Sequence, residues 1–377
     1  MAQQDPFLGR NILNGTLHIQ QKIGSGGMGA VYKAHQPELK RLVAVKILHP
    51  KLADRKDLVS RFGREARALS QLSHPNTVRV FDYGELEDGP LYIVMEFLEG
   101  RNLNQTVRVE GALSAERALP ILIQSCGALD EAHKAGIIHR DLKPENIFLV
   151  QSAPLRDFPK LLDFGLAKVG EQQMRPGSVV LTQEGMVFGT PEFMSPEQAQ
   201  GKTLTAASDV YSLAVILYEV LTGKLPFDAR NAMEYIQHHV TGKPIPINQR
   251  TPGRTFPPLL EQIVHRALAK RPEDRFATAA DFGTSLQWVL NGASQLPPHL
   301  APPSARMLAA PPVSKSSSSA PSASRQPLVV HSASKPTLPE VATDRRSMSM
   351  QQLLVVAFAF TLLGIALALV LMKVLGR

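Results

Sequence analysis

Residues 139–146 read H-R-D-L-K-P-E-N and bring an acid, two cations and an amide together within eight residues. Asp141 could accept the proton of a hydroxyl group, and Lys143 could neutralise a phosphate during its transfer. Asn146, five residues after the acid, could hold a metal ion. The spacing therefore predicts a catalytic loop for phosphoryl transfer. The alternative is a surface turn with ordinary salt bridges, and residues elsewhere in the chain must decide between the two.

A glycine-rich stretch, residues 23–33, reads I-G-S-G-G-M-G-A-V-Y-K. The pattern G-x-G-x-x-G alone is weak, because dinucleotide-binding folds also contain it, with a helix directly after the glycines. Here residues 30–34 and 42–48 alternate and are rich in β-branched side chains, which favours two strands joined by a turn. We therefore predict a hairpin lid whose backbone N–H groups approach phosphate oxygens, because glycine has no Cβ in the way.

Lys46 ends the run V-A-V-K, 22 residues after the first glycine of this stretch. Its ammonium could bridge nucleotide phosphates, although a lone Lys is more often a solvated side chain. Its predicted partner is Glu65, in a stretch from 57 to 72 whose apolar residues recur at helical steps. The alternative for Glu65 is a solvated carboxylate beside Arg61 or Arg64.

The elements that must position these residues follow from the patterns between them. Residues 78–83 and 91–97 predict a pair of strands with a turn at Asp88-Gly89. Glu99-Gly100 is a predicted hinge. The stretch 114–133 has helical apolar spacing after a Ser that can cap a helix, so this helix would lead directly into the catalytic loop.

The composition changes after Leu290. Ten prolines and a run of four serines lie between residues 291 and 345, and so few large apolar residues cannot bury a core. We expect a disordered linker over residues 291–350. Residues 353–372 carry no charge, and 20 helical residues span roughly the 30 Å of bilayer hydrocarbon. This predicts a transmembrane helix followed by a short end, residues 373–377; a buried core helix is the alternative.

The formal charge of +8 comes mostly from this tail, where Lys and Arg outnumber Asp and Glu by 8 to 2, against 33 to 31 in the first 290 residues. The folded part has no dense basic run with interleaved aromatic residues, so nucleic acid is not a predicted partner.

Cys126 is the only cysteine, which excludes an intrachain disulfide and fits a reducing compartment. Residues 1–10 have no apolar core, so no secretory signal is expected.

In their order, these motifs resemble those of the eukaryotic-like (Hanks-type) serine/threonine protein kinases, and the apolar segment resembles that of the bacterial membrane-anchored members. The resemblance covers residues 17–290 and implies an α+β, two-lobed fold. The N-lobe, residues 17–97, would be mostly β with one key helix, and the C-lobe, residues 98–290, mostly helical. Residues 1–16 would be an N-terminal extension. The matching residues are Gly24, Gly26, Gly29, Val31, Lys46, Glu65, His139, Arg140, Asp141, Asn146, Asp163, Phe164, Gly165, the run from Gly189 to Glu197, Asp209 and Arg275.

The resemblance implies ATP as the phosphate donor, with Mg²⁺ or Mn²⁺. Asp141 would be the catalytic base, and Lys143 would stabilise the charge of the γ-phosphate. Asn146 and Asp163 would bind the metal, because oxygen ligands suit a hard cation.

The resemblance also implies the nucleotide contacts. Lys46 would contact the α- and β-phosphates and pair with Glu65. Apolar side chains would sandwich the adenine, with Met95 as the gatekeeper, and the backbone after it would bind the adenine edge. The implied nucleotide-binding residues are Ile23, Gly24, Ser25, Gly26, Gly27, Met28, Gly29, Val31, Ala44, Lys46, Met95, Glu96, Leu98 and Phe148.

Regulation is implied by Arg140, because an Arg beside the catalytic base commonly receives a phosphate from the activation segment. The candidate phosphorylation sites are Ser178 and Thr182, whereas Thr190 would be structural. The resemblance also implies structural roles for three other residues. Glu197 and Arg275 would form a buried ion pair, and Asp209 would hold the catalytic loop by backbone hydrogen bonds.

The chain departs from the family pattern in a few places. Residues 151–160 lengthen the span before Asp163, so an elaborated hairpin is expected there. Tyr211 and Ala214 stand where the family often has Trp and Gly, and we expect packing changes only.

The predicted function is a membrane-tethered kinase that transfers the γ-phosphate of ATP to Ser and Thr hydroxyls of proteins and is regulated by autophosphorylation, with a homodimer that would allow phosphorylation in trans. The kinase domain would lie in the cytoplasm, on a single-pass anchor in the inner (plasma) membrane. One alternative is a non-catalytic kinase-like scaffold. Phosphorylation of a small molecule is disfavoured, because residues 189–197 resemble a peptide-docking segment.

Overall fold

The computed structural model describes residues 5–26, 29–49, 56–152, 155–164 and 190–301, all within one compact unit, residues 1–312. Of the linker predicted over residues 291–350, residues 291–301 are described, and Leu300 among them is buried. The rest of the predicted linker, the predicted membrane span and the candidate phosphorylation sites Ser178 and Thr182 lie outside the described residues. Across the described ranges, no helix combines the length and the apolar character needed to cross a membrane.

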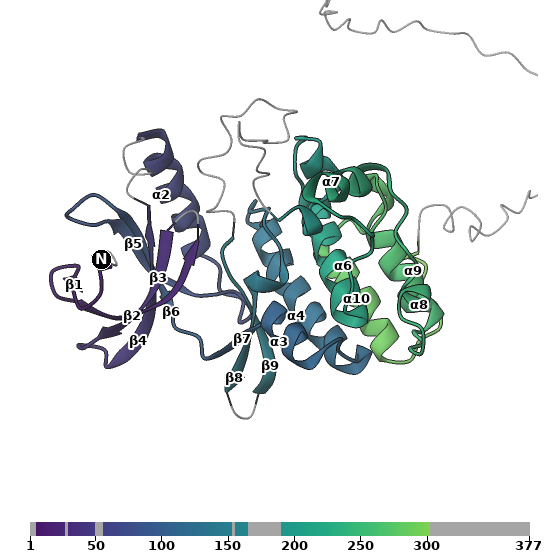
Figure 1. The fold of residues 1–377 in the computed structure, drawn as a ribbon, viewed down its shortest axis with the longest axis horizontal. Helices are drawn as coiled ribbons and strands as arrows, with labels where there is room; N and C mark the ends of the chain where they lie inside the picture. The colour runs from purple at the N-terminus through teal and green to yellow at the C-terminus, as the bar shows by residue number, and fades with distance from the viewer. Residues whose placement is uncertain (1–4, 27–28, 50–55, 153–154, 165–189, 302–377) are drawn as a thin grey trace, which may run out of the picture. The chain divides into compact units, whose positions relative to one another are not determined.

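The described residues up to Glu96 form an antiparallel six-stranded sheet in the order β1-β2-β3-β4-β6-β5. Alternation explains the strands: in β2, Leu17 and Ile19 are buried between exposed neighbours, which is the period of a half-buried strand. Among the described residues of this part, the helix α2 (Lys56–Ser70) contacts β5 and lies beside the sheet (Figure 1). The strands are β1 (Asn11–Ile12), β2 (Leu17–Gly26), β3 (Gly29–Gln36), β4 (Arg41–Leu48), β5 (Val80–Glu85) and β6 (Leu91–Glu96).

A smaller sheet follows, with three antiparallel strands in the order β7-β8-β9. Its strands are β7 (Gly100–Asn102), β8 (Ile147–Ser152) and β9 (Leu155–Leu161). β8 and β9 are paired from Ile147 with Leu161 out to Ser152 with Leu155. The elaborated hairpin predicted over residues 151–160 is therefore confirmed.

The rest of the described chain is mostly helical (Figure 1). α6 is buried along almost its whole length, and a helix that is apolar on all sides is typical of a domain interior. Cys126 of α4 is buried, and Gly283 of α10 packs so closely that a Cβ there would lie 2.8 Å from the Cys126 Cβ. The helices are α3 (Leu103–Glu110), α4 (Ala115–Lys134), α5 (Pro196–Ala199), α6 (Ala206–Thr222), α7 (Ala232–Thr241), α8 (Ile247–Arg250), α9 (Pro258–Ala267) and α10 (Ala279–Leu290), with 3-10 turns η1 (Pro144–Asn146), η3 (Pro191–Phe193) and η4 (Pro272–Asp274).

The predicted division into a β-rich N-lobe and a helical C-lobe is confirmed by these elements. The helix predicted over residues 57–72 and the strands predicted over 78–83 and 91–97 are found as α2, β5 and β6, with ends that differ by a few residues. The loop at residues 139–146 lies between α4, the first long helix of the C-lobe, and β8.

Candidate functional site

The backbone of the loop at residues 139–146 is held by a carboxylate from α6. Asp209 is almost fully buried, and its two oxygens accept hydrogen bonds from the backbone N–H groups of His139 at 2.8 Å and Arg140 at 3.1 Å. Arg140 has a φ of 68°, a left-handed conformation that costs free energy in a non-glycine residue. The bonds to Asp209 offset this cost, so the structural role predicted for Asp209 is confirmed.

His139 joins this loop to the segment that carries Asp163. Its ring is buried, which lowers its pKa and keeps it neutral. The Nε2 atom lies 2.9 Å from the carbonyl oxygen of Leu162, and a carbonyl only accepts, so Nε2 carries the proton. The ring also packs on Phe164, with 4.6 Å between the centroids.

Two predicted catalytic residues and one predicted metal ligand meet inside the loop. Lys143 Nζ donates to Asp141 Oδ2 at 2.7 Å, and Asn146 Nδ2 donates to the backbone oxygen of Asp141 at 2.8 Å. A carboxylate that can accept a hydroxyl proton therefore has an ammonium beside it that can face a phosphate, which is the electrostatic arrangement that phosphoryl transfer requires.

Asp163 and Lys46 meet although 117 residues separate them: Lys46 Nζ donates to Asp163 Oδ1 at 2.7 Å. Lys46 is on β4, where its register partners are Val31 on β3 and Ile93 on β6. Burial opposes ionisation of Asp163, but the positive charge and the hydrogen bond of Lys46, with a smaller contribution from Lys143, outweigh it and lower the pKa. Asp163 is therefore a carboxylate at neutral pH.

Glu65 lies on α2 and lines a cavity of about 480 Å³ together with Arg140 and Phe164. In the part of the chain that the structure describes, the ion pair of Lys46 is with Asp163. The pairing of Lys46 with Glu65 that the resemblance implies therefore stays a prediction.

The predicted glycine hairpin is formed by β2 and β3, which are paired up to Gly26 and Gly29. A strand, not a helix, follows the glycines, so the dinucleotide alternative is wrong. Gly29 has a φ of +151°, and a Cβ there would lie 2.1 Å from the backbone oxygen of Ile47. Only glycine fits at this position. Gly27 and Met28, also predicted to bind the nucleotide, lie outside the described residues.

The residues predicted around the adenine lie on several strands. Ala44 on β4 is the register partner of Met95 on β6, and Phe148 on β8 is paired with Asn102. Ile23 on β2 is 45% exposed, so it is open to contact with a ligand. Glu96 ends β6, and Leu98 follows in the connection to β7. Contact of these residues with adenine remains a prediction.

Asn146 and Asp163 fit a hard cation. The amide nitrogen of Asn146 is bonded to Asp141, which leaves its oxygen as the atom that can face a metal. Together with the ionised Asp163 this gives two oxygen donors, a set typical of Mg²⁺ sites completed by water and phosphate oxygens. Within the described ranges, no group of three or more His, Cys, Asp or Glu side chains is arranged to hold a metal on its own.

The segment predicted to dock peptides is fastened in two places. Arg275 donates from Nη1 and Nη2 to the two carboxylate oxygens of Glu197, both at 2.8 Å, so the predicted buried ion pair is confirmed. Gln198 Nε2 donates to the backbone oxygen of Arg140 at 3.0 Å. This second contact joins the segment to the catalytic loop, and our reading of the sequence missed it.

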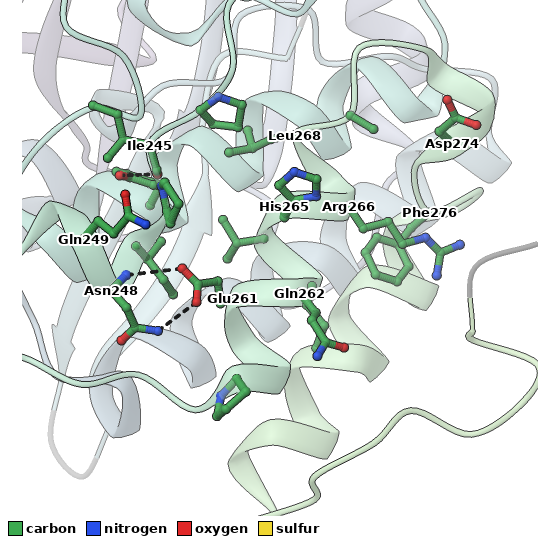
Figure 2. A pocket seen from close by; sticks show the side chains of 18 of the residues that line it. Ile245, Asn248, Gln249, Glu261, Gln262, His265, Arg266, Leu268, Asp274 and Phe276 are labelled. Atoms are coloured by element: carbon green, nitrogen blue, oxygen red, sulfur yellow. Dashed lines mark hydrogen bonds between the residues drawn. The ribbon is translucent and has the colours of Figure 1, made fainter. Parts of the chain in front are cut away.

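Figure 2 shows a separate cavity of about 900 Å³ in the helical lobe. Its walls come mainly from α8, α9 and the residues before α8. There the Glu261 carboxylate accepts a hydrogen bond from Asn248, whose Nδ2 lies 3.0 Å from Glu261 Oε2. Its lining, within the described ranges, includes none of the predicted catalytic residues, so we assign the chemistry to the catalytic loop and not to this cavity.

Comparison with known proteins agrees with this geometry. Residues 17–287 match the protein kinase domain family. The chain is 43% identical over 285 residues to the serine/threonine-protein kinase pkn3 of Myxococcus xanthus, which covers 76% of this chain and 52% of that protein. It is 39% identical over 308 residues to the serine/threonine-protein kinase PknB of Mycolicibacterium smegmatis, which covers 80% of this chain and 48% of that protein.

Among solved structures, the Mycobacterium tuberculosis PknI kinase domain matches with a TM-score of 0.56 at 27% identity, covering 74% of this chain and 97% of that one. The chain spans about half the length of the curated relatives it matches. Its kinase-domain match, its two-lobed fold and its bacterial serine/threonine kinase relatives show that it belongs to the protein kinase family, as a bacterial Hanks-type member.

Proposed function

We propose that this chain is an ATP-dependent protein kinase that transfers the γ-phosphate of ATP to Ser and Thr hydroxyls of proteins. The observation that carries the proposal is the Asp141 carboxylate with Lys143 Nζ 2.7 Å away, in a loop that Asp209 holds in place. The relatives named above support the choice of Ser and Thr as acceptors.

In the proposed reaction, Asp141 orients the acceptor hydroxyl and takes its proton as the oxygen bonds to the γ-phosphorus. The bond from that phosphorus to the bridging oxygen breaks, and ADP leaves. Lys143 offsets negative charge on the phosphoryl oxygens. Lys46 would hold the α- and β-phosphates, and Asn146 and Asp163 would hold Mg²⁺ or Mn²⁺, which neutralises phosphate charge when bound.

Incubation of the full chain with labelled ATP and magnesium tests this proposal. We expect label on added protein, with phosphoserine or phosphothreonine after hydrolysis, and a loss of at least about 100-fold in the Asp141→Asn variant. Asp228→Asn is a matched control, because it makes the same chemical change at a carboxylate that is 75% exposed. Equal labelling by Asp141→Asn, or no labelling by the wild type, would favour the scaffold alternative.

We further propose that the kinase is anchored by residues 353–372 in the inner (plasma) membrane, with its catalytic domain in the cytoplasm. The support is the uncharged 20-residue stretch, which is long enough to cross a bilayer. Fractionation of cells that express the full chain, or a chain ending at residue 301, tests the anchor. Equal amounts of both chains in the soluble fraction would contradict it.

Regulation by autophosphorylation is also part of the proposal. Arg140 and Arg64 line the same cavity of about 480 Å³, and two guanidinium groups suit a phosphate. The phosphate would be on Ser178 or Thr182, and one chain of a homodimer would transfer it to the other chain. Mixing a longer, tagged Asp141→Asn chain with the active chain tests this: mass spectrometry should find phosphate on Ser178 or Thr182 of the inactive chain. An unmodified inactive chain would exclude the trans route.

A further inference from the structure

Two buried side chains hold the backbone at the start of the predicted peptide-docking segment. His239 of α7 has Nε2 3.0 Å from the carbonyl oxygen of Glu192, in η3, and Nδ1 2.9 Å from the hydroxyl of Tyr211, in α6. Tyr211 and His239 both have 0% exposure. The hydrogen bonds therefore form a chain from α6 through α7 to η3, shielded from water.

The proton positions in this chain follow from its chemistry. Burial, with the nearby charge of Lys270, lowers the pKa of His239 to about 3, so the ring is neutral. The Glu192 carbonyl only accepts, so Nε2 carries the ring proton and donates it. Nδ1 is then an acceptor, and the Tyr211 hydroxyl donates to it. Each atom has one defined role, and removal of any member leaves a buried polar group without its partner.

Packing around His239 keeps the ring in this orientation. Phe227 meets it edge to face, with 5.2 Å between the centroids. The Lys270 ammonium lies 4.5 Å from the centroid of Phe227 and donates to the backbone oxygen of His238 at 2.9 Å. α7 lies against both η3 and α5. The ring therefore has little freedom to turn away from Glu192.

The carbonyl that His239 holds belongs to a segment linked to the catalytic loop. Six residues after Glu192, Gln198 donates to the backbone oxygen of Arg140, which precedes Asp141. A shift of the backbone at Glu192 would therefore change the surface that is proposed to receive the acceptor protein. Through Gln198 and Arg140, that surface is linked to Asp141, the proposed proton acceptor.

We propose that His239 and Tyr211 are positioning residues for the acceptor protein: they hold the Glu192 carbonyl so that residues 190–199 keep the shape that docks a peptide. The inference rests on the proposed kinase function. It also revises our sequence-based view of Tyr211, which predicted a packing change only. The Tyr211 hydroxyl, which the Trp often found at this position in the family lacks, makes the hydrogen bond that orients His239.

Steady-state kinetics of the full chain, with dephosphorylated casein as the acceptor, test the proposal. Tyr211→Phe removes a single oxygen atom, and His239→Leu removes both ring nitrogens. We expect each variant to raise the KM for casein by about 5- to 50-fold, the effect of leaving a buried polar group unpaired. The KM for ATP, measured with ATP hydrolysis in the absence of casein, should rise by a smaller factor.

His239→Gln is the matched rescue variant, because an amide can donate to Glu192 and accept from Tyr211. Its KM for casein should lie closer to that of the wild type than to that of His239→Leu. The inference is overturned if the two KM values rise by the same factor in Tyr211→Phe, if neither rises, or if Gln is no better than Leu. A wild-type chain that does not phosphorylate casein would instead overturn the proposed function, and the inference with it.

Discussion

Lys160 Nζ lies 2.6 Å from Glu96 Oε1, so the strand that leads to Asp163 is tied to the last residue of β6. The backbone N–H of Arg79 donates to the same carboxylate oxygen at 2.7 Å. Nearby, the Val78 N–H donates to the carbonyl of Leu161 at 3.0 Å. The C-lobe strand β9 and the connection predicted to bind the adenine edge are therefore held together.

Replacing Lys160 by Met should weaken nucleotide binding. The variant keeps the length of the side chain but leaves the partly buried Glu96 carboxylate without its ammonium, so the connection after β6 loses one of its restraints. Loss of a partly buried, charged hydrogen bond predicts an increase in the KM for ATP of about 3- to 30-fold. Lys134→Met is the control, because Lys134 is 79% exposed in its ion pair with Asp130. Equal KM values for Lys160→Met and the wild type would contradict the role of this contact.

Gly29→Ala should destabilise the nucleotide-free protein, because the new Cβ would lie 2.1 Å from the Ile47 oxygen at a φ that side chains rarely adopt. We expect the free energy of unfolding to fall by more than about 1 kcal/mol. Gly26→Ala is a matched change in the same hairpin, and a Cβ there meets nothing within 4 Å. Urea denaturation without ATP should separate the two variants. Similar midpoints for both would show that the close approach at Gly29 is not rigid.

Elements that depend on local sequence could be predicted, whereas contacts between distant residues could not. The hairpin, α2 and the loop at residues 139–146 depend on periodicity and on spacing along a short stretch of chain, so they could be predicted. The contacts of Lys160 with Glu96 and of His239 with Glu192 join residues 64 and 47 positions apart. No local pattern encodes such pairs, because they depend on how the lobes and helices pack. The one sequence signal for Lys160 is its position three residues before Asp163.

Asp209→Asn should loosen the catalytic loop. Asp209 accepts from the backbone N–H groups of His139 and Arg140, and its Oδ2 also lies 2.8 Å from His133 Nε2. An amide has one accepting oxygen, so its NH₂ group would face a donor and one buried N–H would lose its partner. We expect a fall in kcat of about 10-fold or more, with a loss of stability of roughly 1–3 kcal/mol. Asp274→Asn, at a site 58% exposed, is the control; an unchanged kcat for Asp209→Asn would show that the loop holds its shape without these bonds.

Glu219 should make the protein less stable as the pH rises. Burial raises its pKa to about 7, with further increases from the charges of Glu145 and Glu192, against an ordinary value of 4.5. Below that ordinary value Glu219 is protonated in both the folded and the unfolded state and costs nothing. Between pH 4.5 and about 7 the unfolded state loses the proton first, which favours unfolding. Above about 7 the cost is complete, at roughly 3 kcal/mol.

Glu219→Gln removes the ionisable group, so its stabilising effect should be larger at pH 8 than at pH 5. Urea denaturation of the wild type and the variant at the two pH values measures the difference. Glu38→Gln, an exposed site on the turn between β3 and β4, is the control and should have little effect at either pH. A Glu219→Gln effect of the same size at both pH values would show that the carboxyl group has the same affinity for protons in the folded and unfolded states.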